Sequence, residues 1–155
     1  MGLLTPLAVR IGAIGWMPKA LPLIEKTDSR LQRVTHGRVS LLDIAGLPNL
    51  LLRVPGRKSG VLRSTPLLCA PRSADEWLIA GSYFGNPKTP TWVYNLRATD
   101  SAEIVVDGTP IAVSWREAGD DRPALWAELL DVWPNFRLYE QRTDRTIPVF
   151  VLTRR

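Results

Sequence analysis

One short segment carries the donors that an anion-binding loop needs. Gly56-Arg57-Lys58-Ser59-Gly60 combines two glycines, two cations and a hydroxyl, and Arg63 follows it. Glycines can take positive φ, which lets successive backbone N–H groups converge on one anion. Arginine adds a planar fork matched to phosphate or carboxylate oxygens, and lysine adds a mobile point charge. The pentapeptide alone fits an anion grip or an exposed hairpin with solvated charges equally well. Its spacing matches neither a Walker A loop nor a GxGxxG fingerprint.

The positive charge of the chain is concentrated around this segment. The formal net charge is +5, yet no acidic residue lies between Asp43 and Asp75. The basic residues of that interval are Arg53, Arg57, Lys58, Arg63 and Arg72. A local basic field of this kind attracts an anionic partner: a phosphate-bearing cofactor, nucleic acid or lipid headgroups.

A second loop has the composition of a binding-site lining. Residues 81–90 are rich in glycine and proline and lead into a predicted helix that carries Tyr94 and Asn95. Such a loop at a helix N-terminus offers free backbone donors to an anionic or carbonyl group. Tyr83 and Phe84 would contact a flat ring system, although aromatic residues beside a turn are also common in ordinary packing.

Aromatic residues recur at every third position near the end of the chain. Trp133, Phe136 and Tyr139 form one face of a predicted helix, and such a stripe favours core packing. Tyr139 differs from the other two because its hydroxyl needs water, a protein partner or a ligand.

Short strands with a few helices must position these residues. Apolar runs bounded by Gly, Pro and Asp predict strands, and Asp107-Gly108 predicts a hairpin turn. The predicted strands are residues 39–44, 50–54, 62–70, 77–80, 102–106, 111–115 and 149–152. The predicted helices are 27–36, 91–96, 123–132 and 135–142, with Asp120 or Asp121 as the N-cap of the third. We expect one folded domain of the mainly β (α+β) class, a barrel of strands with helices inserted.

The first 24 residues are apolar, with leucine and isoleucine at steps of three and four residues. Arg10, Lys19 and two prolines interrupt this run, and a membrane span needs about 20 apolar residues in a row. The run also lacks the charged start and cleavage site of a secretory signal. We expect a helix that lies on a membrane surface or packs on its own domain.

Cysteine and histidine each occur once, as Cys69 and His36. This excludes an internal disulfide and a structural zinc site, so we expect no metal and a cytoplasmic location. Cys69 lies in the apolar run Leu67–Ala70, which predicts a buried and inert thiol. His36 is expected to complement the dipole at a helix end rather than to act in catalysis.

Four blocks of the chain together resemble the deazaflavin (F420)-dependent nitroreductase family, the deazaflavin-dependent oxidoreductases of actinobacteria. The blocks are Gly56–Gly60, Arg63–Leu67, Ala80–Ser82 with Pro90–Leu96, and Tyr139–Arg145 leading into Ile147–Val149. The resemblance covers residues 41–152. It implies a split β-barrel of the FMN-binding, pyridoxamine-phosphate-oxidase-like type over residues 39–155, preceded by a helical segment over 1–38.

The resemblance also implies roles for individual residues. The phosphate and acidic tail of coenzyme F420 would be bound by Arg57, Lys58, Ser59 and Arg63. The deazaflavin cleft would be lined by Ser64, Thr65, Pro66, Leu67, Leu68, Ala80, Gly81, Ser82, Tyr83, Thr91, Trp92, Val93, Tyr94 and Asn95. The substrate face would be formed by Trp133, Phe136 and Tyr139, with Tyr139 and Ser82 as the catalytic hydrogen-bond donors. Phe136 stands where relatives often carry a tyrosine.

The implied activity is hydride transfer from reduced coenzyme F420 to an electron-poor acceptor. We favour a quinone, because a helix at residues 1–24 that touches the membrane would bring the site to a lipid-dissolved substrate. Nitroaromatic compounds are a second acceptor class, for which Phe136 lacks a hydroxyl.

Three alternatives remain: an FMN-binding split-barrel enzyme, a non-catalytic deazaflavin carrier, and a basic β-barrel that binds nucleic acid. The density of Arg57, Lys58 and Arg63 favours a long acidic tail over the single phosphate of FMN. The tryptophans lie in apolar contexts away from the basic segment, which argues against stacking on exposed bases and predicts no nucleic acid partner. The oligomeric state stays open.

Overall fold

The structure is a computed structural model that describes residues 46–155. The helices predicted over residues 1–24 and 27–36, the strand predicted over 39–44, and His36 lie outside the described residues. The elements are β1 (Asn49–Pro55), β2 (Leu62–Leu68), β3 (Ala70–Ser73), β4 (Glu76–Ala80), η1 (Tyr83–Gly85), α4 (Thr91–Arg97), β5 (Ser101–Val106), β6 (Thr109–Glu117), α5 (Arg122–Val132), α6 (Phe136–Gln141) and β7 (Val149–Arg154). No helix within this range is long and apolar enough to cross a membrane.

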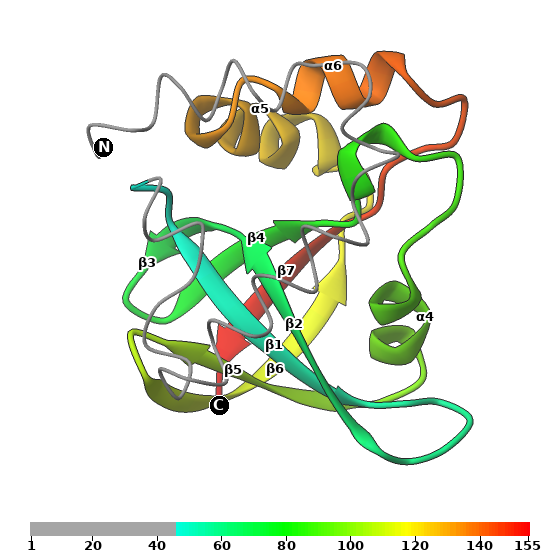
Figure 1. The fold of residues 1–155 in the computed structure, drawn as a ribbon. Coiled ribbons are helices and arrows are strands. Elements are labelled where there is room, and N and C mark those ends of the chain that lie inside the picture. Colours follow the sequence, from blue (N-terminus) through cyan, green and yellow to red (C-terminus); the bar gives the residue numbers. More distant parts are fainter. Residues whose placement is uncertain (1–45) are drawn as a thin grey trace.

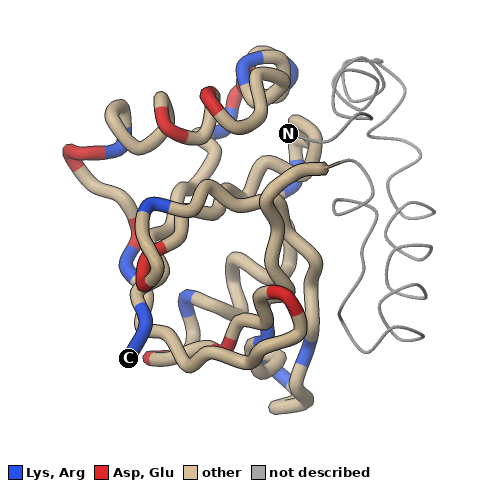
Figure 2. Tube along the Cα trace, turned by 90° about the vertical axis from the view of Figure 1, so that its left-hand side faces the viewer, with Lys and Arg blue, Asp and Glu red and all other residues tan. Residues whose placement is uncertain are grey.

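The strands form one seven-stranded antiparallel sheet in the order β2-β1-β5-β6-β7-β4-β3. The two edge strands, β2 and β3, follow each other in the chain with only Cys69 between them. A one-residue connection between opposite edges requires the sheet to curl until those edges approach each other (Figure 1). The strands accordingly trace a curved wall when seen from the side (Figure 2). This is the expected split β-barrel with added helices.

The strand predicted over residues 62–70 is two strands. Residues of β2 pair with β1 and residues of β3 pair with β4, so the chain leaves one sheet edge and starts the other at Cys69. The Cys69 amide donates to the Pro48 carbonyl oxygen at 3.0 Å, which fixes this corner beside the start of β1. Cys69 and Ala70 are both buried, so the apolar run continues through the bend and hides it from sequence reading.

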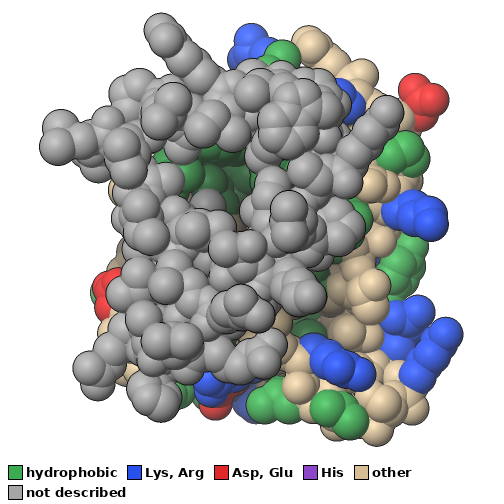
Figure 3. All heavy atoms as spheres, in the orientation of Figure 1, with side chains coloured by type: hydrophobic (Ala, Val, Ile, Leu, Met, Phe, Trp, Pro, Cys, Tyr) green, Lys and Arg blue, Asp and Glu red, His purple; other side chains and the backbone are tan. Residues whose placement is uncertain are grey.

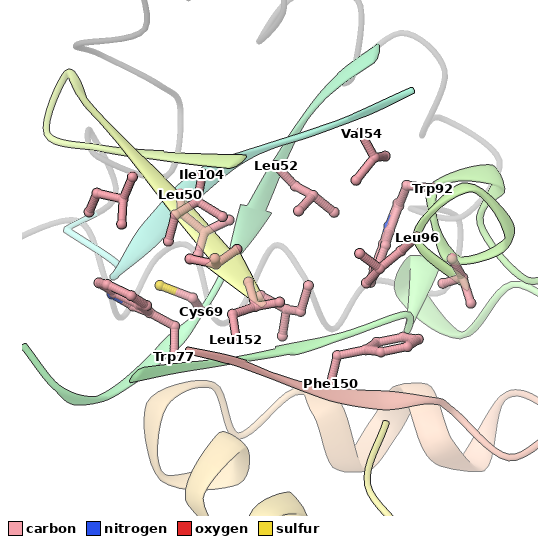
Figure 4. Packing of buried hydrophobic residues seen from close by; sticks show 14 residues of the cluster. Leu50, Leu52, Val54, Cys69, Trp77, Trp92, Leu96, Ile104, Phe150 and Leu152 are labelled. Atoms are coloured by element: carbon pink, nitrogen blue, oxygen red, sulfur yellow. The ribbon is translucent and has the colours of Figure 1, made fainter. Parts of the chain in front are cut away.

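Alternation along the strands separates two hydrophobic layers. In β4, Trp77 and Ile79 point into the barrel, whereas Leu78 and Ala80 pack on the outer face. Figure 4 shows side chains from β1, β4 and β7 meeting in the inner layer, with Trp92 of α4 joining them. Helices α5 and α6 cover the outer face of the sheet (Figure 1).

Two local predictions have different outcomes. The hairpin turn between β5 and β6 is confirmed, since Asp107 and Gly108 have φ of 50° and 79°, the left-handed values of a tight hairpin turn. Asp121 directly precedes α5, but its side chain makes no capping hydrogen bond. Its carboxylate instead accepts from the Gly119 amide at 3.1 Å and pairs with Arg116 at 2.7 Å. The Asp121 carboxylate therefore pairs with Arg116 instead of capping α5.

Candidate functional site

The Gly56–Gly60 loop connects β1 to β2 and uses the N–H groups of both its glycines internally. The Gly56 amide donates to the Val61 carbonyl oxygen and the Gly60 amide to that of Gly56, both at 2.8 Å. Gly60 has φ of +72°, whereas Gly56 lies outside the left-handed region and is constrained by space. A Cβ atom at Gly56 would lie 2.9 Å from Ser59 Oγ. Of the two glycines, only Gly60 takes the expected positive φ. The Lys58 and Ser59 N–H groups form no hydrogen bond within the described residues, so they stay available to a ligand together with the side chains.

The loop is docked on α4, far away in sequence. Asn95 is 5% exposed, and its Oδ1 accepts from the Arg57 backbone amide at 3.1 Å and from Arg57 Nη1 at 3.4 Å. The Arg57 guanidinium lies 5.1 Å from the centre of the Tyr94 ring. These contacts make the first and third predicted blocks parts of one surface.

The cations of this surface are available to a ligand. Arg57, Lys58 and Arg63 are exposed, and none of them forms an ion pair with another residue of the described range. Figure 3 shows basic side chains gathered over the hairpin of β1 and β2, at the lower right, without an acidic side chain beside them. By contrast, Arg53, at the middle of β1, is paired with Glu103 at 3.0 Å. The donor set therefore fits a ligand with several negative charges, such as an acidic tail.

Strand geometry divides the expected contacts of β2 between two faces. Thr65 and Leu67 lie opposite Leu52 and Leu50, whose side chains point into the barrel. The other expected contacts of this strand are Ser64, Pro66 and Leu68, which lie on the opposite face. A single ring cannot contact all five side chains, because successive side chains of a strand point to opposite faces. The backbone edge of β2, unpaired on its outer side by any described strand, is the feature that the five residues share.

The expected contacts from α4 divide in the same way. Trp92 and Val93 belong to the inner hydrophobic layer, so their side chains help to build the barrel. Thr91 and Tyr94 are exposed, and Tyr94 is 43% exposed beside Arg57. Tyr94 is thus the aromatic side chain of this helix that a ligand can reach.

Ala80 and Gly81 support the cleft rather than line it with side chains. Ala80 is 8% exposed and packs in the outer hydrophobic layer. A Cβ atom at Gly81 would lie 2.8 Å from Val93 Cγ2 and 2.9 Å from Pro148 Cγ. Glycine is needed here because β4, α4 and the start of β7 approach one another closely.

The segment after Gly81 makes a left-handed turn. Tyr83, Phe84 and Gly85 have φ of 47°, 54° and 77°. The Gly85 amide donates to the Ser82 carbonyl oxygen at 2.8 Å, and the Asn86 amide to that of Tyr83 at 3.0 Å. Two consecutive non-glycine residues in this region store strain, which persists only where the surroundings enforce it. Strain of this kind is common at functional sites.

Arginines after α6 hold the turn through its carbonyl groups. Arg142 Nη1 donates to the Phe84 carbonyl oxygen at 3.2 Å. Arg145 donates through Nε to the Asn86 carbonyl oxygen and through Nη2 to that of Ser82, both at 3.0 Å. Burial lowers the pKa of the Arg145 guanidinium, and nearby Tyr94 opposes this shift. Sequence reasoning gave these arginines no role, because their partners are backbone carbonyls that no motif records.

The aromatic stripe packs in the core, as its spacing favours. Trp133, Phe136 and Tyr139 are 6%, 4% and 2% exposed and belong to the outer hydrophobic layer. Trp133 Nε1 donates to the Tyr139 hydroxyl at 3.1 Å, and the Tyr139 ring lies 5.4 Å from that of Phe84. Burial raises the pKa of the Tyr139 hydroxyl to about 12. Tyr139 therefore supports the turn through Phe84, and its contact with an acceptor stays a prediction.

Ser82 is the expected catalytic residue that keeps an available donor. It is half-buried at the start of the turn, and its hydroxyl forms no hydrogen bond inside the described part of the chain. Its carbonyl oxygen is held by the Gly85 amide and by Arg145. A fixed backbone with an uncommitted hydroxyl is the arrangement needed to donate to a ligand oxygen.

Comparison with known proteins also indicates a protein that uses coenzyme F420. A family model described as F420H(2)-dependent quinone reductase matches residues 25–154. An F420H(2)-dependent quinone reductase of Mycobacterium tuberculosis is 36% identical over 129 residues, which cover 81% of this chain and 86% of the relative.

Two solved structures also resemble the chain. A structure described as an F420-H2 dependent reductase is 29% identical, with a TM-score of 0.61 over 68% of this chain and 93% of the other. A structure described as a domain-swapped dimer is 28% identical, with a TM-score of 0.64 over 83% of this chain and 94% of the other.

Proposed function

Because the chain belongs to the family of F420H(2)-dependent quinone reductases, we propose that it transfers a hydride from reduced coenzyme F420 to a quinone. It is an oxidoreductase, and reduced coenzyme F420 is its cofactor. The observation that carries the proposal is a set of cations that form no ion pair with another residue of 46–155, on a loop that Asn95 anchors to α4. This set provides what the acidic tail of the coenzyme requires: several positive charges in a fixed place.

The basic loop, Gly56–Gly60 with Arg63 at the start of β2, binds the acidic tail of the coenzyme. Lys58 and Arg63 are exposed and supply mobile charge, while Arg57 is held over Tyr94 and presents the rest of its guanidinium fork. Ser59 Oγ already accepts from the Val61 amide at 3.2 Å, so its remaining role is to donate its own proton. The tail is thus bound by charge and by hydroxyl donation, with the loop backbone as the frame.

The turn at Ser82 binds the reacting end. When bound, reduced coenzyme F420 supplies a hydride from its deazaflavin ring. A quinone that accepts a hydride gains negative charge on an oxygen and then takes up a proton to become a hydroquinone. The Ser82 hydroxyl donates a hydrogen bond to that oxygen, and Tyr94 contributes an aromatic wall between the turn and the basic loop. The side chains bind and orient, and no covalent nucleophile is required.

The test uses the purified full chain without oxygen. We expect it to oxidise reduced coenzyme F420 when a menaquinone analogue is supplied and to form hydroquinone in equal amount. Ser82→Ala should lower kcat by about tenfold or more while the dissociation constant of the coenzyme stays unchanged. Ser101→Ala, a half-buried serine on β5 outside the site, is the matched control. Full activity of Ser82→Ala would remove Ser82 from the mechanism.

The choice of F420 over FMN can be measured directly. Equilibrium titration of the purified chain should give tighter binding of coenzyme F420 than of FMN, because FMN offers one phosphate to three cations. Tighter binding of FMN would contradict the proposal. Tight binding of coenzyme F420 without turnover of any quinone or nitroaromatic compound would identify a carrier instead.

We further propose cytoplasmic location with peripheral membrane contact through residues 1–24. The support is the composition of that segment, which is apolar but interrupted by charges and prolines. The experiment compares the full chain with a chain lacking residues 1–24, using quinone dissolved in liposomes and a water-soluble quinone analogue. Removal should slow only the liposome reaction. Equal rates for both chains would remove the membrane argument.

A further inference from the structure

The Arg145 side chain forms hydrogen bonds to both ends of the left-handed turn at residues 82–86. Its Nη2 and Nε donate to the carbonyl oxygens of Ser82 and Asn86, which flank Tyr83, Phe84 and Gly85. A planar guanidinium fixes the separation of two such carbonyls, which a flexible ammonium or a single amide does less well. Figure 1 shows η1 next to the segment that descends from α6 toward β7, from which Arg145 reaches it.

The burial of Arg145 beside this turn has a free-energy cost that packing alone does not explain. Arg145 Nη1 is buried and has no hydrogen-bond partner, and Arg145 pairs with no carboxylate of the described residues. An unsatisfied buried donor destabilises a folded protein. The turn it supports is itself strained at two non-glycine residues. The buried unsatisfied donor and the strained turn are both unfavourable and lie at one place. This indicates that the function requires the shape of the turn.

We infer that Arg145 is a positioning residue that holds the left-handed turn and, through it, the Ser82 hydroxyl for the acceptor. The inference rests on the proposed function of Ser82. Arg145 acts through the backbone, and its two bonded nitrogens are already occupied by carbonyl oxygens. Its removal should therefore disturb the chemical step while leaving the basic loop, and hence coenzyme affinity, intact.

The matched control is Arg122, which also donates through Nε and Nη2 to a backbone carbonyl oxygen, that of Ile147, at 3.2 and 2.7 Å. It lies at the start of α5, and its carbonyl partner lies outside the turn. Arg145→Gln should speed hydrogen exchange at the Gly85 and Asn86 amides in the absence of coenzyme, whereas Arg122→Gln should not. Arg145→Lys should restore part of the protection and serves as the second variant where Arg145→Gln folds poorly.

The kinetic test is a double-mutant cycle with Ser82→Ala. Arg145→Gln should lower kcat by about tenfold, with the dissociation constant of coenzyme F420 within about twofold of wild type. The double variant should be no slower than the slower single variant, because one effect passes through the other. Unchanged amide exchange, or additive losses in kcat, would overturn the inference. If the wild-type chain turns over no quinone, the proposed function fails, and amide exchange alone decides whether Arg145 holds the turn.

Discussion

At the loop between β1 and β2, the Gly56, Arg57 and Gly60 N–H groups are already bonded, so a ligand can use the side-chain charges and the Lys58 and Ser59 N–H groups. Sequence reasoning located the cations of this loop correctly but assigned part of the binding to glycine-directed N–H groups. The Gly56 and Gly60 N–H groups bond within the loop and that of Arg57 bonds to Asn95, whereas those of Lys58 and Ser59 form no hydrogen bond within the described residues. The residue types were readable because charge density survives any local conformation. The partner of each N–H group was not readable, because Asn95 lies 38 residues away.

The first prediction for a single residue concerns Lys58. Lys58→Ala should weaken binding of coenzyme F420 by about tenfold, because one charge-assisted contact with the tail is lost. The unfolding free energy should not change, since Lys58 is exposed and unpaired within residues 46–155. Isothermal titration at low and moderate salt measures both affinity and its ionic-strength dependence. Arg137→Ala, an exposed cation on α6, is the control and should bind like wild type.

Two buried groups that can lose a proton, the Cys69 thiol and the Tyr139 hydroxyl, predict how stability changes at high pH. Burial raises the pKa of the Cys69 thiol from 9.0 to about 12 and that of the Tyr139 hydroxyl from 10.0 to about 12. The folded state thus holds both protons more tightly than the unfolded state does. The contribution of these two groups to stability should be constant well below pH 9 and fall as the pH rises toward 12, by at most about 1.4 kcal/mol per pH unit for each group.

The check is chemical denaturation at pH 8 to 11 on wild type and Cys69→Ala. Between pH 9 and 10, where the thiol of the unfolded chain ionises ahead of the tyrosine hydroxyl, Cys69→Ala should make the decline less steep. An identical slope in the two proteins would show that Cys69 is not the group responsible. The expectation of a buried thiol at Cys69 is confirmed, and the raised pKa favours the less reactive thiol form over the thiolate.

At the scale of elements, the left-handed turn and the basic loop each depend on one glycine. Gly60 and Gly85 have nearly equal φ, +72° and +77°. A Cβ atom at Gly60 would meet nothing within 4 Å, whereas one at Gly85 would lie 2.7 Å from the Tyr139 carbonyl oxygen. Gly60→Ala should cost about 1–2 kcal/mol from the backbone alone, and Gly85→Ala clearly more. Thermal denaturation compares them, and equal losses would show that η1 is not pressed against α6.

Asn95 joins two elements, so its variants separate position from charge. Asn95→Ala removes the acceptor for Arg57 and should lower the unfolding free energy by about 1 kcal/mol and weaken coenzyme binding. Asn95→Asp keeps an acceptor but places a carboxylate beside Arg57, so stability should be retained while the tail is bound less tightly. Denaturation and titration on both variants provide the measurements. Tail binding by Asn95→Asp as tight as wild type would contradict the role of Arg57.

The elements themselves were largely predictable. Strands β1, β4, β5, β6 and β7 and helices α4, α5 and α6 appear within a few residues of their predicted bounds, because alternation and turn residues encode them locally. The break at Cys69 was missed because the apolar run Leu67–Ala70 continues through the corner, and Pro71, just after it, was the signal that could have marked it. The left-handed turn was also missed, because Tyr83 and Phe84 rarely adopt positive φ.

For the whole molecule, the curl of the sheet creates the site. Curling joins the loop after β1, the turn after β4 and the segment before β7 on one side, although they are far apart in the chain (Figure 1). The family resemblance supplied the fold and cofactor class before any geometry was known. It could not tell buried from accessible members of the implied site, and Tyr139 and Trp92 prove to be buried. Burial depends on which helix covers which face, a property of the assembled fold.

The central claim is that the basic loop holds coenzyme F420 so that its hydride reaches a quinone near Ser82. A single-turnover experiment tests it most directly: the full chain is loaded with one equivalent of reduced coenzyme F420 and mixed, without oxygen, with a menaquinone analogue. The account predicts that coenzyme oxidation and hydroquinone formation proceed together, in equal amounts, and slow markedly in Ser82→Ala. Bound coenzyme that stays reduced in the presence of the quinone, at the rate seen without protein, would contradict it.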